Sequence, residues 1–156
     1  MKGSRADLSS SPCGIARALH VVGDWWSLLI VRDVLAGKTR FSEIQNNLGC
    51  AKNILSARLK KLIEDGVVDA RPDGSGTRHH YQLTKKGRDL HVALAALWQW
   101  GAEHCTDHGR IRRVLADRST GLPLDTVAVF TTDGTAFSQT GFEVIAKPSS
   151  AKRATN

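Results

Sequence analysis

The stretch FSEIQNNLGCAKNILSARLKKLIEDG, residues 41–66, reads as two short helices separated by a tight turn. In its first half, Phe41, Ile44 and Leu48 recur at spacings of three and four, the periodicity of a helix with one apolar face. Gly49 follows at once, as glycine often does just past a helix. Two helices joined in this way predict a helix-turn-helix, whose second helix enters the major groove of DNA.

The second helix of this stretch has an apolar side and a polar side. Its apolar side carries Leu55, Leu59 and Leu62. Steps of about 100° per residue gather four polar side chains into one arc, namely Lys52, Asn53, Ser56 and Lys60. Lys bonds guanine and Asn bonds adenine in the major groove. We therefore expect this arc to face DNA, with Lys60 nearer the backbone; the alternative is an ordinary solvated face.

Composition limits the kind of protein that the chain can be. It has 156 residues and a formal net charge of +7, which favours one main domain and an anionic partner such as nucleic acid or a membrane surface. The apolar runs are far shorter than the roughly 18 residues of a membrane span, and the N-terminus lacks the apolar region of a signal peptide. We expect a soluble, cytoplasmic protein without membrane contact, whose three scattered cysteines are thiols.

Residues before the helix-turn-helix predict two more helices. A flexible N-terminal arm over 1–12 precedes a helix at about 15–22. Asp24 is placed to cap the next helix, which ends at Gly37 and is apolar on most of its circumference, so it should be the buried spine of the domain. Thr39 is the expected N-cap of the helix that follows.

Residues after Gly66 predict a β-hairpin, because VVDAR and TRHHYQL flank the turn sequence PDGSG. A basic hairpin directly after a recognition helix is the wing of a winged helix; the alternative is an ordinary surface hairpin. Alternation along the second strand places His79 inward, as a core histidine; the alternative is a sensor. The side chains expected to contact phosphate or to act from the wing are Arg40, Arg78, His80 and Lys85.

The next segment predicts a long helix over residues 85–104, capped by Thr84. Its three-four alternation gives a packing seam of Leu90, Leu94, Leu97, Trp98 and Gly101. Such a helix has more apolar surface than a small domain can cover, so we expect a symmetric homodimer. The predicted fold class is α+β and mostly α: a winged helix-turn-helix domain over 13–106 that includes this dimerisation helix.

The C-terminal part predicts less. Short β-prone runs over 107–148 indicate a small β-rich appendage, and 149–156 look like a disordered basic tail. The residues His104, Cys105 and His108 include a histidine pair at i,i+4, but no second ligand pair follows, so we predict no metal site. Catalytic motifs and cofactor loops are also absent from the sequence, and we expect neither an enzyme nor a cofactor.

Several of these segments resemble the HxlR family of winged-helix, MarR-like transcriptional regulators. They are CGIARAL (13–19), GDWWSLLIVRDVLAGKTRFSEI (23–44), SARLKKLIEDGVV (56–68) and YQLTKKG (81–87), within a match over about 13–104. The resemblance implies a homodimer, paired through its outer helices, that binds inverted-repeat operators with two recognition helices and two wings. Ala51 departs from the family's usual Ser at the start of the recognition helix, so the cap must come from elsewhere or be lost, at a cost of about 1 kcal/mol.

A candidate sensor lies at the start of this domain, at Cys13, where a helix N-terminus and Arg17 one turn later would favour thiolate. The resemblance adds that some HxlR relatives use a cysteine here as a redox sensor; the alternative is a small packed thiol. We interpret the chain as a DNA-binding regulator and expect a repressor, with an oxidant or a small molecule as candidate effector. The competing hypothesis is a protein-interaction module that uses a winged-helix scaffold without specific DNA binding.

Overall fold

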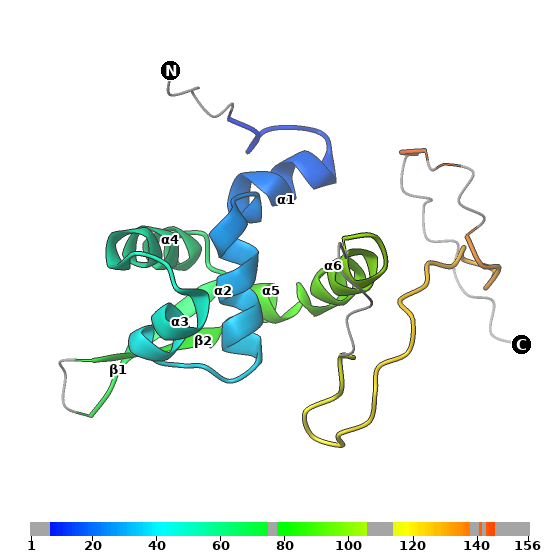
Figure 1. Cartoon of the computed structure of the whole chain (residues 1–156). Coiled ribbons are helices and arrows are strands. Elements are labelled where there is room, and N and C mark those ends of the chain that lie inside the picture. Colours follow the sequence, from blue (N-terminus) through cyan, green and yellow to red (C-terminus); the bar gives the residue numbers. More distant parts are fainter. Residues whose placement is uncertain (1–6, 75–77, 106–113, 138–140, 142, 146–156) are drawn as a thin grey trace, which may run out of the picture. The chain divides into compact units, whose positions relative to one another are not determined.

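The computed structural model describes residues 7–74, 78–105, 114–137, 141 and 143–145, in two compact units, Met1–Asp125 and Thr126–Asn156. Residues 1–6 of the predicted arm, His108 and the tail 149–156 lie outside the described residues. The named elements are α1 (Gly14–Val22), α2 (Trp25–Leu35), α3 (Phe41–Leu48), α4 (Lys52–Glu64), β1 (Val68–Pro72), β2 (His79–Leu83), α5 (Lys85–Arg88) and α6 (His91–His104) (Figure 1). The predicted winged-helix order is confirmed.

Helix α2 is the spine of the first unit, with α3 and α4 on one side and α6 on the other (Figure 1). Its Ile30 and Val31 are fully buried in a core completed by the leucines of α4. The predicted cap is confirmed, since the Asp24 carboxylate accepts the backbone N–H groups of Trp26 and Ser27 at 3.0 and 3.1 Å. The spine is not buried throughout, because Trp25 is 88% exposed.

None of the helices among the described residues is by itself long and apolar enough to cross a membrane. Helices α1 and α2 reach that length and composition together, but they meet at a bend of 80°.

The helix-turn-helix forms as predicted, with a different cap at its start. The Glu43 carboxylate accepts the N–H groups of Thr39 and Arg40 at 3.0 and 2.9 Å, so the start of α3 is capped from inside the helix rather than by the Thr39 hydroxyl. Gly49, with φ of +64°, ends α3. Helix α4 begins after Ala51 without any side-chain cap, so no other side chain replaces the one that a serine would supply here.

Strands β1 and β2 form the predicted antiparallel hairpin, which extends away from the helices (Figure 1). At the base of this two-stranded sheet, residues 39–40 pair with β2, and we call this short pairing segment the edge strand. The Tyr81 N–H donates to the Thr39 carbonyl at 2.7 Å, and Arg40 forms an isolated bridge with His80. The prediction for His79 is wrong. It pairs with Pro72 at the far end of the hairpin, beyond the reach of the core, and is exposed.

The expected single helix over 85–104 is divided into α5 and α6. Between them, the Leu90 N–H bonds to the Gly87 carbonyl three residues back, at 3.3 Å, and the Leu90 side chain turns onto the core. Gly87 is buried against the Val67 carbonyl, which fixes α5 on the hairpin base. The Thr84 cap is confirmed, because its hydroxyl accepts the Gly87 N–H at 3.2 Å.

Residues 114–137 form tight loops rather than the predicted strands. One loop has a single bridge between Ala116 and Pro123, and a later loop has one between Phe130 and Ala136. Hydroxyl and N–H donors of Ser119 and Thr120 hold the pKa of Asp117 at about 2. The described side chains here are mostly exposed, so no apolar layer extends the bridges into a sheet.

Candidate nucleic-acid interface

The outer face of α4 carries the four side chains that the sequence singled out. Lys52, Asn53, Ser56 and Lys60 are all exposed, while the leucines of the same helix are buried beneath them. The Lys60 ammonium lies 3.9 Å from a Glu64 carboxylate oxygen, too far for a firm ion pair. The face therefore offers cationic, amide and hydroxyl groups at the N-terminal half of the helix, where a recognition helix meets base edges. Their contact with DNA stays a prediction.

The predicted backbone contacts come from three places around α4. Arg40 precedes α3, Arg78 precedes β2, and both are exposed. His80 is half-buried on β2, with Nδ1 3.3 Å from the Thr39 hydroxyl. These side chains belong to two segments, 39–40 and 78–81, that the edge-strand bonds hold side by side.

Lys85 is the predicted contact with the strongest competing partner. Its ammonium donates to the Asp89 carboxylate at 2.7 Å, and this bond holds the pKa of Asp89 below its ordinary value. The pair is exposed, so exchange of Asp89 for a phosphate is feasible at small cost.

A shallow cavity of about 260 Å³ separates α4 from the hairpin. Apolar walls come from Phe41, Leu59, Ile63 and Tyr81, and the polar lining comes from Ser56, Lys60 and Glu64. Burial raises the pKa of the Tyr81 hydroxyl. The cavity marks the groove between the recognition helix and the wing, and it belongs to the same face.

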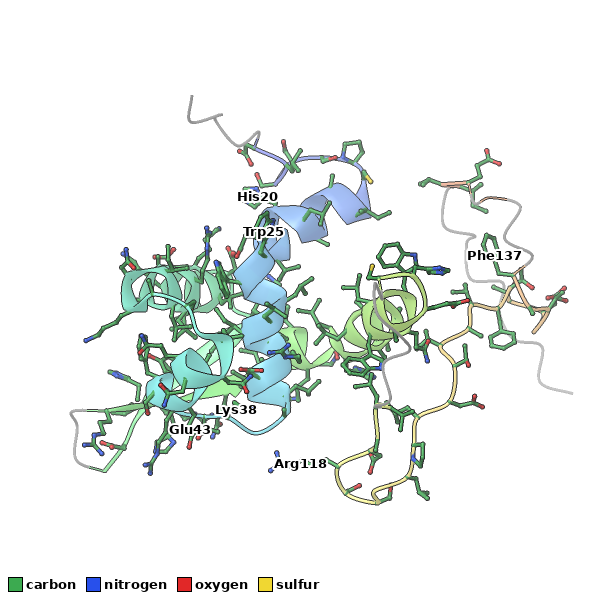
Figure 2. The ribbon with its side chains drawn as sticks, viewed as in Figure 1. His20, Trp25, Lys38, Glu43, Arg118 and Phe137 are labelled. Atoms are coloured by element: carbon green, nitrogen blue, oxygen red, sulfur yellow. The ribbon has the colours of Figure 1, made fainter. Side chains whose placement is uncertain are left out.

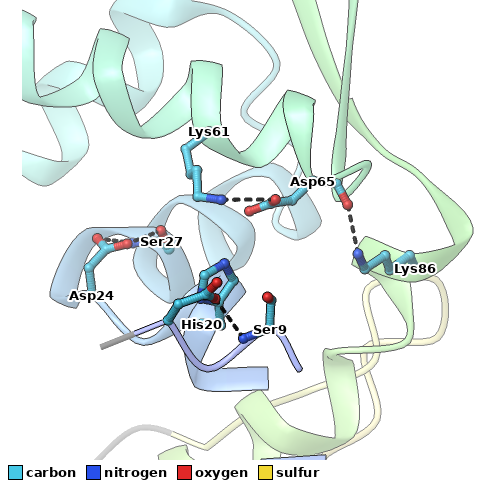
Figure 3. Close-up of polar contacts among 8 residues, drawn as sticks. Ser9, His20, Asp24, Ser27, Lys61, Asp65 and Lys86 are labelled. Atoms are coloured by element: carbon cyan, nitrogen blue, oxygen red, sulfur yellow. Dashed lines mark hydrogen bonds and ion pairs between the residues drawn. The ribbon is translucent and has the colours of Figure 1, made fainter. Parts of the chain in front are cut away.

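Two buried carboxylates fix the helix-turn-helix on α2, in contacts that the sequence pattern did not predict. Asp24 binds Arg58 of α4, with Nε to Oδ1 at 3.3 Å, and also accepts the Ser27 hydroxyl (Figure 3). Asp33, 1% exposed, accepts the Asn47 side-chain amide of α3 at 2.7 Å. Arg58 lies next to Leu59, at the border of the buried face of α4. This position in the helical pattern was the signal that could have distinguished Arg58 from the outward-facing basic residues.

The three cysteines are free thiols in different surroundings. Cys13 is exposed at the N-cap of α1, Cys50 is buried in the turn between α3 and α4, and Cys105 is exposed just past α6. Cys13 therefore has the access that a reactive thiol needs, and Cys50 does not.

The residues of the predicted dimer seam lie in two different environments. Leu90 and Leu94 pack against the core of their own chain. Leu97 is 51% exposed, and Trp98 and Gly101 are half-buried. The exposed apolar surface of this unit also includes side chains outside the predicted seam, namely Ile15, Leu19, Trp25, Val92 and Trp100.

The model of the HxlR-like helix-turn-helix family matches residues 21–109, which is more than half of the chain. The chain belongs to the HxlR-like helix-turn-helix family. This agrees with the resemblance read from the sequence motifs, and the family's named members here are transcriptional regulators rather than enzymes.

Three relatives define the likeness to HxlR proteins. The HTH-type transcriptional regulator Rv3095 of Mycobacterium tuberculosis is 45% identical over 91 residues, 58% of this chain and 58% of that protein's length. The crystal structure of PA1607, a candidate transcription factor, is 42% identical, with a TM-score of 0.80 over 91% of this chain and all of that one. The redox regulator HypR in its oxidized form is 27% identical, with a TM-score of 0.51 over 57% of this chain and 94% of that one.

Proposed function

We propose that this HxlR-like protein is a transcriptional repressor that binds inverted-repeat operator DNA as a homodimer. The polar, acid-free N-terminal half of the outer face of α4 carries this proposal. In each subunit, α4 enters the major groove, and the β1–β2 hairpin and Arg40 contact the phosphate backbone. The net charge of +7 supplies the long-range attraction to DNA.

The homodimer is supported by the apolar side chains that one chain leaves exposed. Leu97 and Trp100 of α6 are 51% and 59% exposed, and Trp25 lies at the start of α2 (Figure 2). Large exposed apolar side chains are typical of an interface between subunits. A symmetric pair presents two α4 helices to half-sites about one helical turn, roughly 34 Å, apart.

The deciding experiment is binding to a pool of random duplex DNA at about 50 and 200 mM salt, followed by sequencing of the retained DNA. Lys52→Ala/Asn53→Ala removes two groove-facing side chains. The control is Arg118→Ala, which removes one charge that lies on neither α4 nor the hairpin. We expect the wild type and Arg118→Ala to enrich the same palindrome, and the double variant to lose it. Affinity should fall roughly a thousandfold between the two salts if six or more phosphates are contacted.

Weak binding without sequence preference by all three proteins would overturn the proposal. A shallow salt dependence would point to the competing hypothesis, in which the winged helix is a scaffold for protein interaction.

An oxidant is one candidate signal. Cys13 is exposed at a helix start, and HypR, a redox regulator, is similar to this chain in fold. We expect hydrogen peroxide, which oxidises a thiolate to a sulfenic acid and is itself reduced to water, to lower operator affinity of the wild type and to leave Cys13→Ser unaffected, with mass spectrometry of proteolytic peptides locating the modified thiol. Equal loss of affinity in both proteins would exclude Cys13 as the sensor.

A further inference from the structure

The shallow cavity between α4 and the hairpin, which we call the α4–hairpin cavity, follows one side of the recognition helix. Its wall on α4 is a single helical stripe, because residues three and four positions apart lie above one another. The members of this stripe are Ser56, Leu59, Lys60, Ile63 and Glu64. The opposite wall comes from Phe41 of α3 and Tyr81 of β2.

The position of the stripe on α4 places it where a DNA backbone passes. The N-terminal half of a recognition helix meets base edges, so the rest of the helix leaves the major groove beside the strand that borders it. Ser56 and Lys60 belong both to the polar arc that we expect to face DNA and to the lining of the cavity. The α4–hairpin cavity is therefore continuous with the proposed DNA interface.

The two ends of the cavity differ in chemistry. The Ser56 hydroxyl and the Lys60 ammonium are donors of the kind that bind phosphate oxygens, and the Lys60 side chain is 78% exposed. Glu64 lies one turn beyond Lys60, so a phosphate is favoured at the Ser56 end.

The remaining walls suit a sugar better than a phosphate. Ile63 is 37% exposed, although the leucines of the same helix are buried, so much of its side chain is left for contact with a ligand. The Phe41 and Tyr81 rings are half-buried beside it. The volume of about 260 Å³ corresponds to roughly nine water molecules at about 30 Å³ each, which is room for one furanose ring.

We propose that the α4–hairpin cavity receives one deoxyribose of each operator half-site, with a flanking phosphate bound by Ser56 and Lys60. The C2′ methylene of this sugar packs against Ile63 and Tyr81. An oxygen on C2′ would lose its hydrogen bonds to water in these apolar surroundings, so the cavity rejects a ribonucleotide at this one position. The deoxyribose subsite rests on the operator binding proposed above, and it adds a contact that reads the sugar rather than the bases.

The subsite is tested with the full-length protein and the palindromic duplex enriched from the random pool. Each duplex of a series carries one 2′-O-methyl nucleotide per half-site, moved along the site one position at a time. We expect a position at which affinity falls by about tenfold or more, because the added oxygen and methyl group must enter the cavity. A 2′-fluoro nucleotide favours the same sugar pucker with a much smaller group, and at that position it should bind nearly as well as the unmodified duplex.

Two isoleucine variants locate the sensitive sugar. Ile63→Ala makes room for the added group, so we expect it to recover at least about fivefold of the affinity lost at that position. Ile54→Ala is the matched control, since Ile54 is also 37% exposed on α4 but is not among the described residues that line the cavity. It should leave the loss unchanged, whatever its effect on binding of the unmodified duplex. Circular dichroism checks that both variants fold.

The charged end is tested with a neutral methylphosphonate in place of a phosphate beside the sensitive nucleotide. It should weaken binding several-fold in the wild type and much less in Lys60→Met, because both changes remove the same contact. Equal weakening of the two proteins would overturn the contact between Lys60 and that phosphate.

The remaining outcomes separate the subsite from the proposed function. Loss of affinity at no position, an equal loss with 2′-fluoro, or equal recovery in Ile63→Ala and Ile54→Ala would each overturn the subsite and leave the proposed function standing. Failure to bind the unmodified duplex would overturn the proposed function, and the subsite with it.

Discussion

The Glu43 side chain caps the start of the helix-turn-helix. Its carboxylate accepts N–H groups from Arg40 and Thr39, and these bonds hold its pKa below the ordinary value of 4.5. When folding lowers the pKa of a carboxyl group, that group stabilises the folded state fully at a pH above its pKa in the unfolded state. This stabilisation is lost as the pH falls through its pKa in the folded state. We expect Glu43→Gln to unfold at lower urea concentration than the wild type at neutral pH, with the gap closing in acid below 4.5. A gap that stays constant through this range would contradict the capping role.

Arg58 and Lys60 are basic residues two positions apart on α4 with opposite roles. Arg58 pairs with the buried Asp24, whereas the Lys60 side chain is 78% exposed. Arg58→Met leaves a buried carboxylate short of a partner, so we expect it to lower the free energy of unfolding by about 1–3 kcal/mol. Lys60→Met should change stability by less than about 0.5 kcal/mol and weaken DNA binding instead. Urea denaturation beside operator titration tests both, and equal stability of the two variants would contradict this division.

At the scale of elements, the junction between the hairpin and α5 depends on the absence of one side chain. A Cβ on Gly87 would collide with the Val67 carbonyl oxygen and crowd Leu83, so Gly87→Ala must push α5 off the hairpin base. We expect a loss of about 1–3 kcal/mol in thermal or urea unfolding. Gly14→Ala, where a Cβ meets nothing within 4 Å, is the control and should be neutral or stabilising by up to about 1 kcal/mol. A Gly87→Ala protein as stable as the wild type would mean that α5 is not pressed on the hairpin.

Local patterns predicted the elements well and their mutual contacts poorly. The alternation of apolar residues located α3 and α4, and the residue types at 24 and 84 identified the caps of α2 and α5, because these signals act within one turn of helix. The edge strand at residues 39–40 was missed because it depends on pairing with residues 40 positions later. The prediction that His79 points inward failed because the alternation of residues along a strand does not tell where the core ends. Among the candidate site residues, exposure on α4 followed from periodicity, but Arg58 needed the fold to reveal Asp24 beneath it.

For the whole molecule, the division into two units leads to a prediction about the C-terminal region. All named helices and strands lie within Met1–Asp125, and the core is drawn from α1, α2, α3, α4 and the hairpin with its flanking residues. We therefore expect a chain ending at Asp125 to keep the cooperative unfolding transition of the full chain within a few degrees. Differential scanning calorimetry of the two proteins tests this. Loss of cooperativity on truncation would show that Thr126–Asn156 stabilises the winged helix.

The short edge strand also limits how these regulators can be recombined. Because Thr39 bonds to Tyr81 and Arg40 bridges His80, the wing shares its backbone hydrogen bonds with the residues that lead into the recognition unit. In a chimera that exchanges only the hairpin, residues 39–40 would come from one parent and their pairing partners on the hairpin from the other, which would disrupt this pairing. Exchange of residues 38–84 as one block keeps both partners from the same parent. Operator specificity should therefore transfer between relatives as a module of that length, and not as a recognition helix or a wing alone.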